Sequence, residues 1–330
     1  WVWIPRYVYK ISSGWHTSTT GTIEVQFSKG INDNWNSSSI GNIDTGTTAN
    51  ASNNKWTNHP AFTFGTDQLM GFWVAKFEAS GTTSAVNSQP NAVSLRELKI
   101  GDMFTASRNM ETNSRYGWGT SGNGIDTHLM KNIEWGAVAY LSKSQYGKET
   151  EEVWINHSNE HITGCAGNFA SFPGYEGCLN AYHTARGVRA STSGTVYGIY
   201  DMSGGADEYV AAYINNGNTN LTANGASIIN ALPKYKDVYN VGTSDSAAAN
   251  YALFTNRKGD ALYETSSSAT GSTAWYSDNT FAPYTSTPWL ARGGAYYFES
   301  LSGIFTFMKN TGAQDAHEGF RPVLIVGPGL

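Results

Sequence analysis

The chain has 330 residues, of which 14% are charged and 13% aromatic, and its formal net charge is −5. A chain of this length can bury a large core, while the acidic balance leaves no basic stripe for phosphates and argues against nucleic acid as a partner. Its apolar runs are far shorter than the roughly 20 residues that span a bilayer, so we expect no direct membrane insertion. Because it begins at Trp1, without an initiator Met or a signal peptide, we expect a processed product or an excised part of a longer protein.

Strand-forming segments dominate the beginning of the chain. Large apolar and polar residues alternate over 1–11 on either side of Pro5, which is typical of an edge strand. Residues 28–57 are mostly Asn, Ser, Thr and Gly and predict an exposed insertion. Strand character resumes at 61–64 and at 71–79, and we expect the second of these to be buried.

One segment has a clear helical period, with a cap at Thr127 or Asn132 and a stop at Gly147. A second, short helix is compatible with 94–98. The apolar residues of the first helix recur at helical spacing: Met130, Ile133, Ala137, Val138 and Leu141.

Long turn-rich stretches follow, and we predict loop insertions over 215–250 and 266–287. The most turn-rich parts are 215–226, 243–250 and 266–273. The chain has no internal repeat and no linker that separates two halves by composition. The simplest interpretation is a single α+β domain over 1–330, irregular and loop-rich.

The two cysteines, Cys165 and Cys178, lie thirteen residues apart in a glycine-rich segment. This spacing can close a disulfide, but two reduced thiols fit the sequence equally well.

Several short motifs, taken in order, resemble the formylglycine-generating-enzyme family. The segment 71–80 resembles its strand ending in Glu-Val-Thr-Asn, and 130–139 is similar to its Glu-Ala-Glu-Trp-Glu helix. Residues 197–210 resemble Gly-Leu-Tyr-Asp-Met-Ser-Gly-Asn-Val-Trp-Glu-Trp, while 292–295 and 319–323 resemble the Arg-Gly-Gly-Ser-Trp and closing Gly-Phe-Arg motifs. The resemblance implies the C-type-lectin-like fold of that family, with long loops and little regular structure.

The carboxy-terminal segment, Trp289 to Leu324, is also similar to the variable proteins of diversity-generating retroelements. In such proteins this segment is hypermutated to change ligand specificity. The resemblance therefore implies that 289–324 faces a ligand.

The absence of the expected catalytic motifs argues against an enzyme. Oxidases of the resembled family need two cysteines shortly after Arg-Gly-Gly, and 295–320 has none. His157 and His161 have the spacing of two metal ligands on a helix, yet Thr163 stands where the sulfoxide-synthase relatives have Glu, so plain loop histidines are the simpler interpretation. We therefore predict no catalytic and no metal residues.

The adjacent carboxylates Asp207 and Glu208 would point to opposite faces of a strand, which does not suit a glycosidase pair. The resembled family often places Asn and Glu near here, and Glu208 could contribute to a Ca²⁺ site, but Gly205 replaces the Asn. The alternative is a structural Glu208 bonded to backbone amides.

Within the carboxy-terminal segment, Arg292 and Arg321 are expected to hold the scaffold, with Phe305, Phe307 and Phe320 in the core. Tyr and Phe offer large contact areas at low entropic cost, as in antibody loops. Strand alternation places Thr306, Met308 and Asn310 on one face. The resemblance implies that this face belongs to the binding surface and that Ala313 lies on its rim. The predicted ligand-binding residues are Ala291, Ala295, Tyr296, Tyr297, Phe298, Glu299, Thr306, Met308, Asn310, Thr311, Gln314, Asp315 and His317.

The leading hypothesis is a non-catalytic adhesin or receptor-binding domain, extracellular, on a bacterial cell surface or at a phage tail tip. Its expected partner is a protein or glycan on a target cell, and a homo-oligomer is compatible with the sequence. The alternatives are an oxidase-like or sulfoxide-synthase-like enzyme with a shifted metal site, and a structural pilus or virion subunit.

Overall fold

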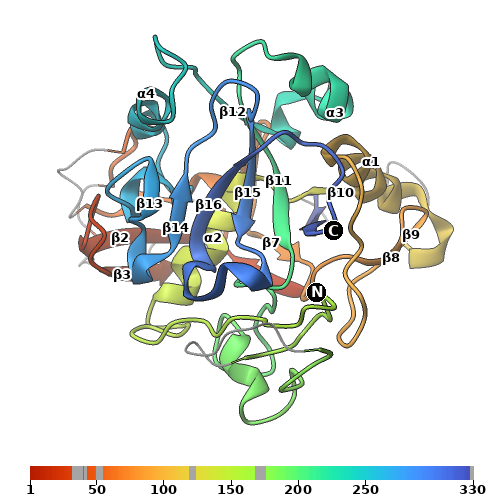
Figure 1. The fold of residues 1–330 in the computed structure, drawn as a ribbon. Coiled ribbons are helices and arrows are strands. Elements are labelled where there is room, and N and C mark those ends of the chain that lie inside the picture. The colour runs from red at the N-terminus through yellow and green to blue at the C-terminus, as the bar shows by residue number, and fades with distance from the viewer. Residues whose placement is uncertain (32–39, 41–42, 50–54, 119–123, 168–175, 328–330) are drawn as a thin grey trace.

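The computed structural model describes residues 1–31, 40, 43–49, 55–118, 124–167 and 176–327. A long mixed sheet crosses the centre of the molecule (Figure 1), and a second, four-stranded sheet carries both the first strand and the last strand of the chain. The α-helices are α1 (Ile100–Asn109), α2 (Asn132–Lys143), α3 (Thr219–Ile229) and α4 (Ala247–Ala252). In the described part of the chain, α and β elements are mixed and strands predominate.

The central sheet has the order β12 (Asp237–Tyr239), β11 (Asp207–Ile214), β15 (Trp289–Gly293), β16 (Gly303–Asn310), β14 (Asn279–Phe281) and β13 (Thr270–Ser272), with β17 (Glu318–Phe320) paired to β11. The four-stranded sheet has the order β1 (Val2–Pro5), β7 (Gly71–Val74), β18 (Pro322–Val326) and β10 (Ile125–Leu129). A three-stranded sheet has the order β3 (Thr22–Phe27), β2 (Tyr7–Ser13), β4 (Thr57–Asn58). Two hairpins, β5 (Thr63–Phe64) with β6 (Asp67–Gln68) and β8 (Ser80–Thr82) with β9 (Ala85–Asn87), complete the strands of the described residues.

Short 3₁₀ helices punctuate the connections. They are η1 (Pro60–Phe62), η2 (Met110–Thr112), η3 (Ser114–Tyr116), η4 (Gly187–Ala190), η5 (Pro233–Tyr235), η6 (Leu253–Asn256), η7 (Tyr263–Thr265), η8 (Trp275–Ser277) and η9 (Tyr296–Leu301).

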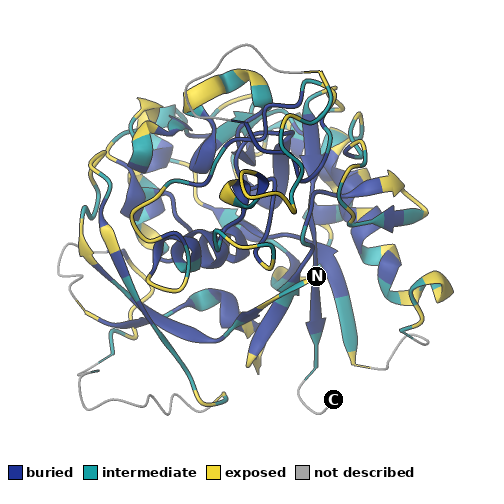
Figure 2. Ribbon diagram, turned by 90° about the horizontal axis from the view of Figure 1, so that it is seen from below, coloured by how far each residue is buried: buried dark blue, intermediate teal, exposed yellow. Residues whose placement is uncertain are grey.

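One continuous apolar core runs from Ile4 to Ile325 and includes side chains from both large sheets and from α2. Figure 2 shows buried strands and helices at the centre and exposed residues in the outer loops and hairpins. A smaller cluster of Phe77, Ala166 and Tyr200 lies beside it. No helix among the described residues is both long enough and apolar enough to cross a bilayer.

The predicted helix after residue 130 is confirmed as α2. Its N-terminal cap is Lys131, whose backbone N–H donates to Glu134 at 2.9 Å, and neither Thr127 nor Asn132 has that role. The helix ends at Lys143, before Gly147. Almost every residue of α2 is buried, because the helix passes through the core instead of lying on the surface.

The residues on the two sides of Pro5 do not form a single edge strand. The segment 1–11 forms two strands: β1, which is the edge of the four-stranded sheet, and β2, which is the centre of the three-stranded one. The predicted strand at 71–79 is confirmed as β7 over its first four residues, three of which are buried.

Three local expectations were wrong. Residues 94–98 form no helix, and α1 begins at Ile100 instead. The expected loops at 215–226 and 243–250 contain most of α3 and the start of α4, and 266–273 contains β13. Only Leu221, Gly225 and Ile228 of α3 are buried, so the helix presents only a narrow stripe of residues to the core. The predicted insertion at 28–57 lies partly outside the described residues; of its described part, Ala49 and Trp56 are buried.

Of the two interpretations of the cysteines, the disulfide is the one found. Cys165 and Cys178 are bonded to each other, with a Cα–Cα distance of 5.3 Å.

Candidate ligand-binding surface

The carboxy-terminal segment is held by two fully buried arginines. Arg292 on β15 donates to the side chain of Asn132 at 3.1 Å and to the backbone oxygens of Asp260, Ala261 and Ile304 at 3.3–3.4 Å. Its guanidinium thereby joins β15 to α2, to the segment before η7 and to β16. The prediction that this arginine belongs to the scaffold is confirmed.

Arg321 has the same role at the end of β17. It donates to both carboxylate oxygens of Glu208, at 3.1 and 2.6 Å, and to the backbone oxygens of Ala75 and Tyr200. Glu208 is therefore bonded to a guanidinium and not, as one alternative had it, to backbone amides. Burial raises the pKa of Glu208 to about 7, although Arg321 opposes the shift.

The arrangement around Glu208 also explains why glycine stands at position 205. Gly205 has a φ of +78°, and a Cβ there would lie 2.7 Å from Oε1 of Glu78. An Asn side chain at this position would meet a buried carboxylate. Arg321 contacts both oxygens of Glu208, so this carboxylate already has a cationic partner.

Between β15 and β16 the chain turns through η9, where three aromatic rings lie together with two histidines. The ring centroids of Tyr296 and Tyr297 are 5.4 Å apart, those of Tyr297 and Phe298 4.6 Å, and those of Tyr297 and His317 4.9 Å. His161 lies 5.1 Å from Tyr296 and 5.3 Å from His317. The side chain of Tyr297 is 44% exposed, so the aromatic cluster reaches solvent.

The backbone beneath this cluster is fixed by hydrogen bonds to the central sheet. The Tyr296 N–H donates to the Gly205 oxygen at 3.0 Å, and the Gly294 N–H donates to Asp207 at 3.2 Å. The Ser302 hydroxyl closes the turn by donating to the Ala295 oxygen at 2.7 Å. The exposed rings therefore stand on an ordered base.

The loop after β16 supplies the second part of the surface. Gln314 and Asp315 are exposed, and Asp315 accepts a hydrogen bond from the His317 N–H at 2.9 Å. Nδ1 of His317 lies 3.2 Å from Nε2 of His161, and Arg96 donates to the oxygen of Ala316. Burial, followed by the positive charge of Arg96, lowers the pKa of His161 to about 3, so this histidine is neutral.

Carboxyl groups underlie the aromatic cluster. Asp207 and Glu318 are register partners on β11 and β17, and both are buried. Burial raises the pKa of Asp207 to about 7, and burial together with Asp207 raises the pKa of Glu318 well above its ordinary value. Burial and these carboxylates raise the pKa of Tyr297 to about 12.

Part of the predicted surface is inaccessible. Ala291, Ala295 and Thr306 are fully buried, and the Thr306 hydroxyl donates to the Leu301 oxygen at 2.8 Å. Alternation along β16 does put Thr306 and Met308 on one face, but that face is covered at Thr306 and partly covered at Met308.

Other predicted residues lie at the margin. Met308 is partly buried against the core, and its sulfur accepts from Asn279. Asn310 is engaged internally, accepting from the Tyr209 hydroxyl at 2.6 Å and donating to Glu318. Thr311 and Ala313 are half-buried, while Glu299 is exposed at the tip of η9. The residues that the fold brings together at the surface are Tyr296, Tyr297, Phe298 and His317.

Two residues that contact this surface from below or beside it, buried His161 and half-buried Arg96, were not predicted to belong to the site. His161 had been considered only as one of two metal ligands with His157. No local pattern links either residue to 289–324, because their contacts bridge 156 and 220 positions of sequence. Among the described residues, no group of three or more His, Cys, Asp or Glu side chains has the arrangement of a metal site.

Comparisons with known proteins add little to this description. No protein-family model matches the chain, and no curated protein matches it. Among solved structures the chain is similar to Treponema denticola variable protein 1, at 9% identity and a TM-score of 0.35, over 78% of this chain and 85% of that one. Similarity at this level is too low to transfer a function, so the function is inferred from the surface itself.

Proposed function

We propose that this chain is a non-catalytic ligand-binding protein. Its binding surface, here called the reader surface, consists of residues from η9 and from the loop after β16: Tyr296, Tyr297, Phe298, Glu299, Gln314, Asp315 and His317. The observation that carries the proposal is the solvent-reaching aromatic cluster held on an ordered base.

The physical chemistry of this cluster suits recognition. Tyrosine and phenylalanine bury large areas while few torsions are immobilised, and aromatic side chains are enriched among the residues that dominate binding energy. The base supports this use, since buried Arg292 joins β15 to β16 on either side of η9 and Arg321 holds the end of β17, while the exposed side chains can change. We expect a protein or glycan ligand on a target cell.

We further propose the formylglycine-generating-enzyme type of C-type-lectin-like fold, display on a bacterial surface or phage tail tip, and diversification of the carboxy-terminal segment by a retroelement. The motif resemblances over 71–80, 130–139, 197–210 and 289–324 support these proposals. A reverse transcriptase gene and an adenine-rich near-copy of the codons for 289–324 in the neighbouring DNA would support diversification. Absence of both would refute it.

The binding test compares Tyr296→Ala and Tyr297→Ala with Tyr197→Ala. Tyr197 is 80% exposed and lies outside the reader surface, so it controls for the loss of an exposed ring. Fluorescently labelled protein would be applied to a glycan array and to intact bacterial cells. We expect the first two variants to lose about tenfold or more in affinity for whatever the parent binds, and Tyr197→Ala to lose none.

Thermal unfolding of the same variants separates a binding defect from a folding defect. Wild-type binding by a folded Tyr297→Ala protein would contradict the assignment of the surface. Stoichiometric copper or iron in the purified protein would contradict the non-catalytic proposal, which is supported by the bond between Cys165 and Cys178 because neither thiolate is free to bind a metal. A homo-oligomer that buries Tyr297 between subunits would instead indicate a structural subunit.

A further inference from the structure

A cleft of about 840 Å³ lies between the amino-terminal end of α2, the β5–β6 hairpin, the segment from η5 to β12, and the residues after η6. Its lining residues include none of the reader surface. A volume between about 300 and 1,000 Å³ is typical of small-molecule sites. The cleft is therefore large enough for a ligand of its own.

The charge of this cleft opposes that of the whole chain. Two carboxylates, Asp44 and Asp237, stand among its described lining residues, on a chain whose net charge is −5. Against them stand six cationic side chains from segments far apart in sequence: Arg6, Lys131, Lys234, Lys236, Arg257 and Lys258.

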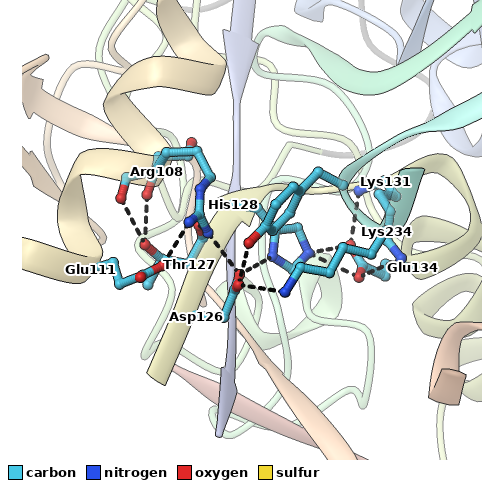
Figure 3. A network of polar contacts seen from close by, with 10 residues as sticks. Arg108, Glu111, Asp126, Thr127, His128, Lys131, Glu134 and Lys234 are labelled. Atoms are coloured by element: carbon cyan, nitrogen blue, oxygen red, sulfur yellow. Dashed lines mark hydrogen bonds and ion pairs between the residues drawn. The ribbon is translucent and has the colours of Figure 1, made fainter. Parts of the chain in front are cut away.

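On one wall of the cleft, the cations share carboxylates that are already engaged (Figure 3). Asp126 contacts Arg108 at 2.9 Å, His128 at 3.2 Å and Lys234 at 3.5 Å. One carboxylate divided among these partners does not neutralise the ammonium group of Lys234, which lies furthest from it. The hydrogen bond and positive charge of His128 hold the pKa of Asp126 at about 2, although burial alone would raise it.

Glu134 is shared in the same way. It contacts His128 at 3.0 Å and Lys131 at 3.4 Å. His128 is buried, and although burial alone would lower its pKa, Glu134 and Asp126 raise it above the ordinary value. His128 therefore shares with Lys131 and Lys234 the two carboxylates on this side of the cleft.

Among the remaining cationic side chains of the cleft, positive and negative charges are closer to balance. Arg257 pairs with Asp237 at 2.5 Å, and Lys258 pairs with Asp44 at 3.3 Å. Lys236 donates to the backbone oxygens of Ile228 and Ile229, which carry no formal charge. The cationic excess of the cleft therefore falls on Lys234, Lys236 and their neighbours.

Uncharged polar groups complete the lining. Asn58 and Asn256 contribute amides, and Thr63 contributes a hydroxyl. Such donors can bond oxyanions beside the cationic groups, and a recessed cluster of one sign of charge concentrates counter-ions.

We propose that this cleft binds a small polyanion that carries two or more carboxylate, sulfate or phosphate groups. The shared chemistry is the negatively charged oxygen, and more than one such group is expected because the cationic side chains line the cleft from several sides. Binding should weaken with added salt, since a cleft open to solvent is screened over the roughly 10 Å Debye length of 0.1 M salt.

The test is isothermal titration calorimetry of the whole chain in a buffer free of phosphate, at 25 mM and 300 mM NaCl. Citrate, pyrophosphate and a sulfated disaccharide distinguish the three anionic groups, and a neutral disaccharide of similar size is the matched control. We expect at least one polyanion to bind at low salt and to lose about tenfold or more in affinity at high salt.

The variants Lys234→Gln, Lys236→Gln and their combination test the location. We expect the double variant to lose at least about tenfold in affinity, while Lys99→Gln, an equal change of charge on an exposed lysine outside the cleft, keeps it. Each single variant provides a second readout if the double variant unfolds. The proposal is overturned if no polyanion binds at millimolar concentration, if the neutral sugar binds as well as the polyanions, or if folded variants bind as the parent does.

Discussion

Replacing Arg321 by methionine would remove the cation that ties the last motif of the chain to the core. The guanidinium donates to Glu208 at 3.1 and 2.6 Å, to the Ala75 oxygen at 2.7 Å and to the Tyr200 oxygen at 2.9 Å. Both partners of the ion pair are at most 1% exposed. The variant keeps most of the side-chain volume but leaves these acceptors without their donor.

Where the remaining group is charged, removing one partner of a buried ion pair costs about 3–5 kcal/mol of unfolding free energy, because that charge stays buried without its partner. The cost should depend on pH. In the wild type the pKa of Glu208 is about 7, above its ordinary value, and loss of Arg321 removes a group that lowers it. The difference between variant and wild type should therefore be constant below about pH 7, where both folded proteins hold the proton, and should widen at higher pH by up to about 1.4 kcal/mol per pH unit.

Urea unfolding followed by tryptophan fluorescence, at pH 6 and at pH 8.5, measures both effects. Arg115→Met is the control, since Arg115 is exposed and an exposed substitution changes stability by no more than about 0.5 kcal/mol. The double variant Glu208→Gln/Arg321→Met should be more stable than the two single losses added together predict. A loss below about 1 kcal/mol for Arg321→Met, or the same loss at both pH values, would refute the reasoning.

Two further predictions concern the whole protein. The free energy of unfolding should fall as pH rises from 6.5 to 8, because buried carboxyl groups keep protons that the unfolded chain has released; burial raises the pKa to about 7 in Asp207, Glu208 and Glu264 and to about 8 in Asp278. Below pH 6.5 this trend is opposed by His59 and His161, which stay neutral because burial lowers their pKa values to about 3. Urea midpoints that rise between pH 6.5 and 8 would contradict the assignment of the carboxyl groups. Replacing both Cys165 and Cys178 by serine should lower the unfolding free energy by about 3 kcal/mol, since the bond closes a loop of thirteen residues, and equal urea midpoints with and without the disulfide would show that it does not constrain the unfolded chain.

Sequence patterns predicted the elements that have a strong local period. The spacing of Met130, Ile133 and Ala137 predicted α2, and the apolar run after Gly71 predicted β7. The same patterns failed for α3 and α4, which are capped by Asn218 and Ser246 and bury only a few of their residues. Local periodicity is informative only where one face of an element is consistently apolar.

The candidate surface likewise combines features that the local sequence predicts with features that it does not. Sequence alone identified Arg292 and Arg321 as scaffold, because arginines flanked by glycine and apolar residues are local features. It also placed the segment Tyr296 to Glu299 at the surface, where Tyr297 and Glu299 are exposed and Tyr296 and Phe298 half-buried. It could not show that Thr306 is covered, since alternation assigns a residue to a face of a strand but does not say what packs on that face.

The chain by itself determined its strand-rich α+β character, helix α2 and the aromatic segment of the reader surface, all of which depend on residues close together in sequence. Tertiary structure alone decided that His161 meets His317, and that Lys131, Lys234 and Arg257 line one cleft. The physical reason is that these residues come from segments far apart in sequence, 156 positions in the case of His161 and His317. Their positions follow from the packing of both large sheets around one core, which no local pattern encodes.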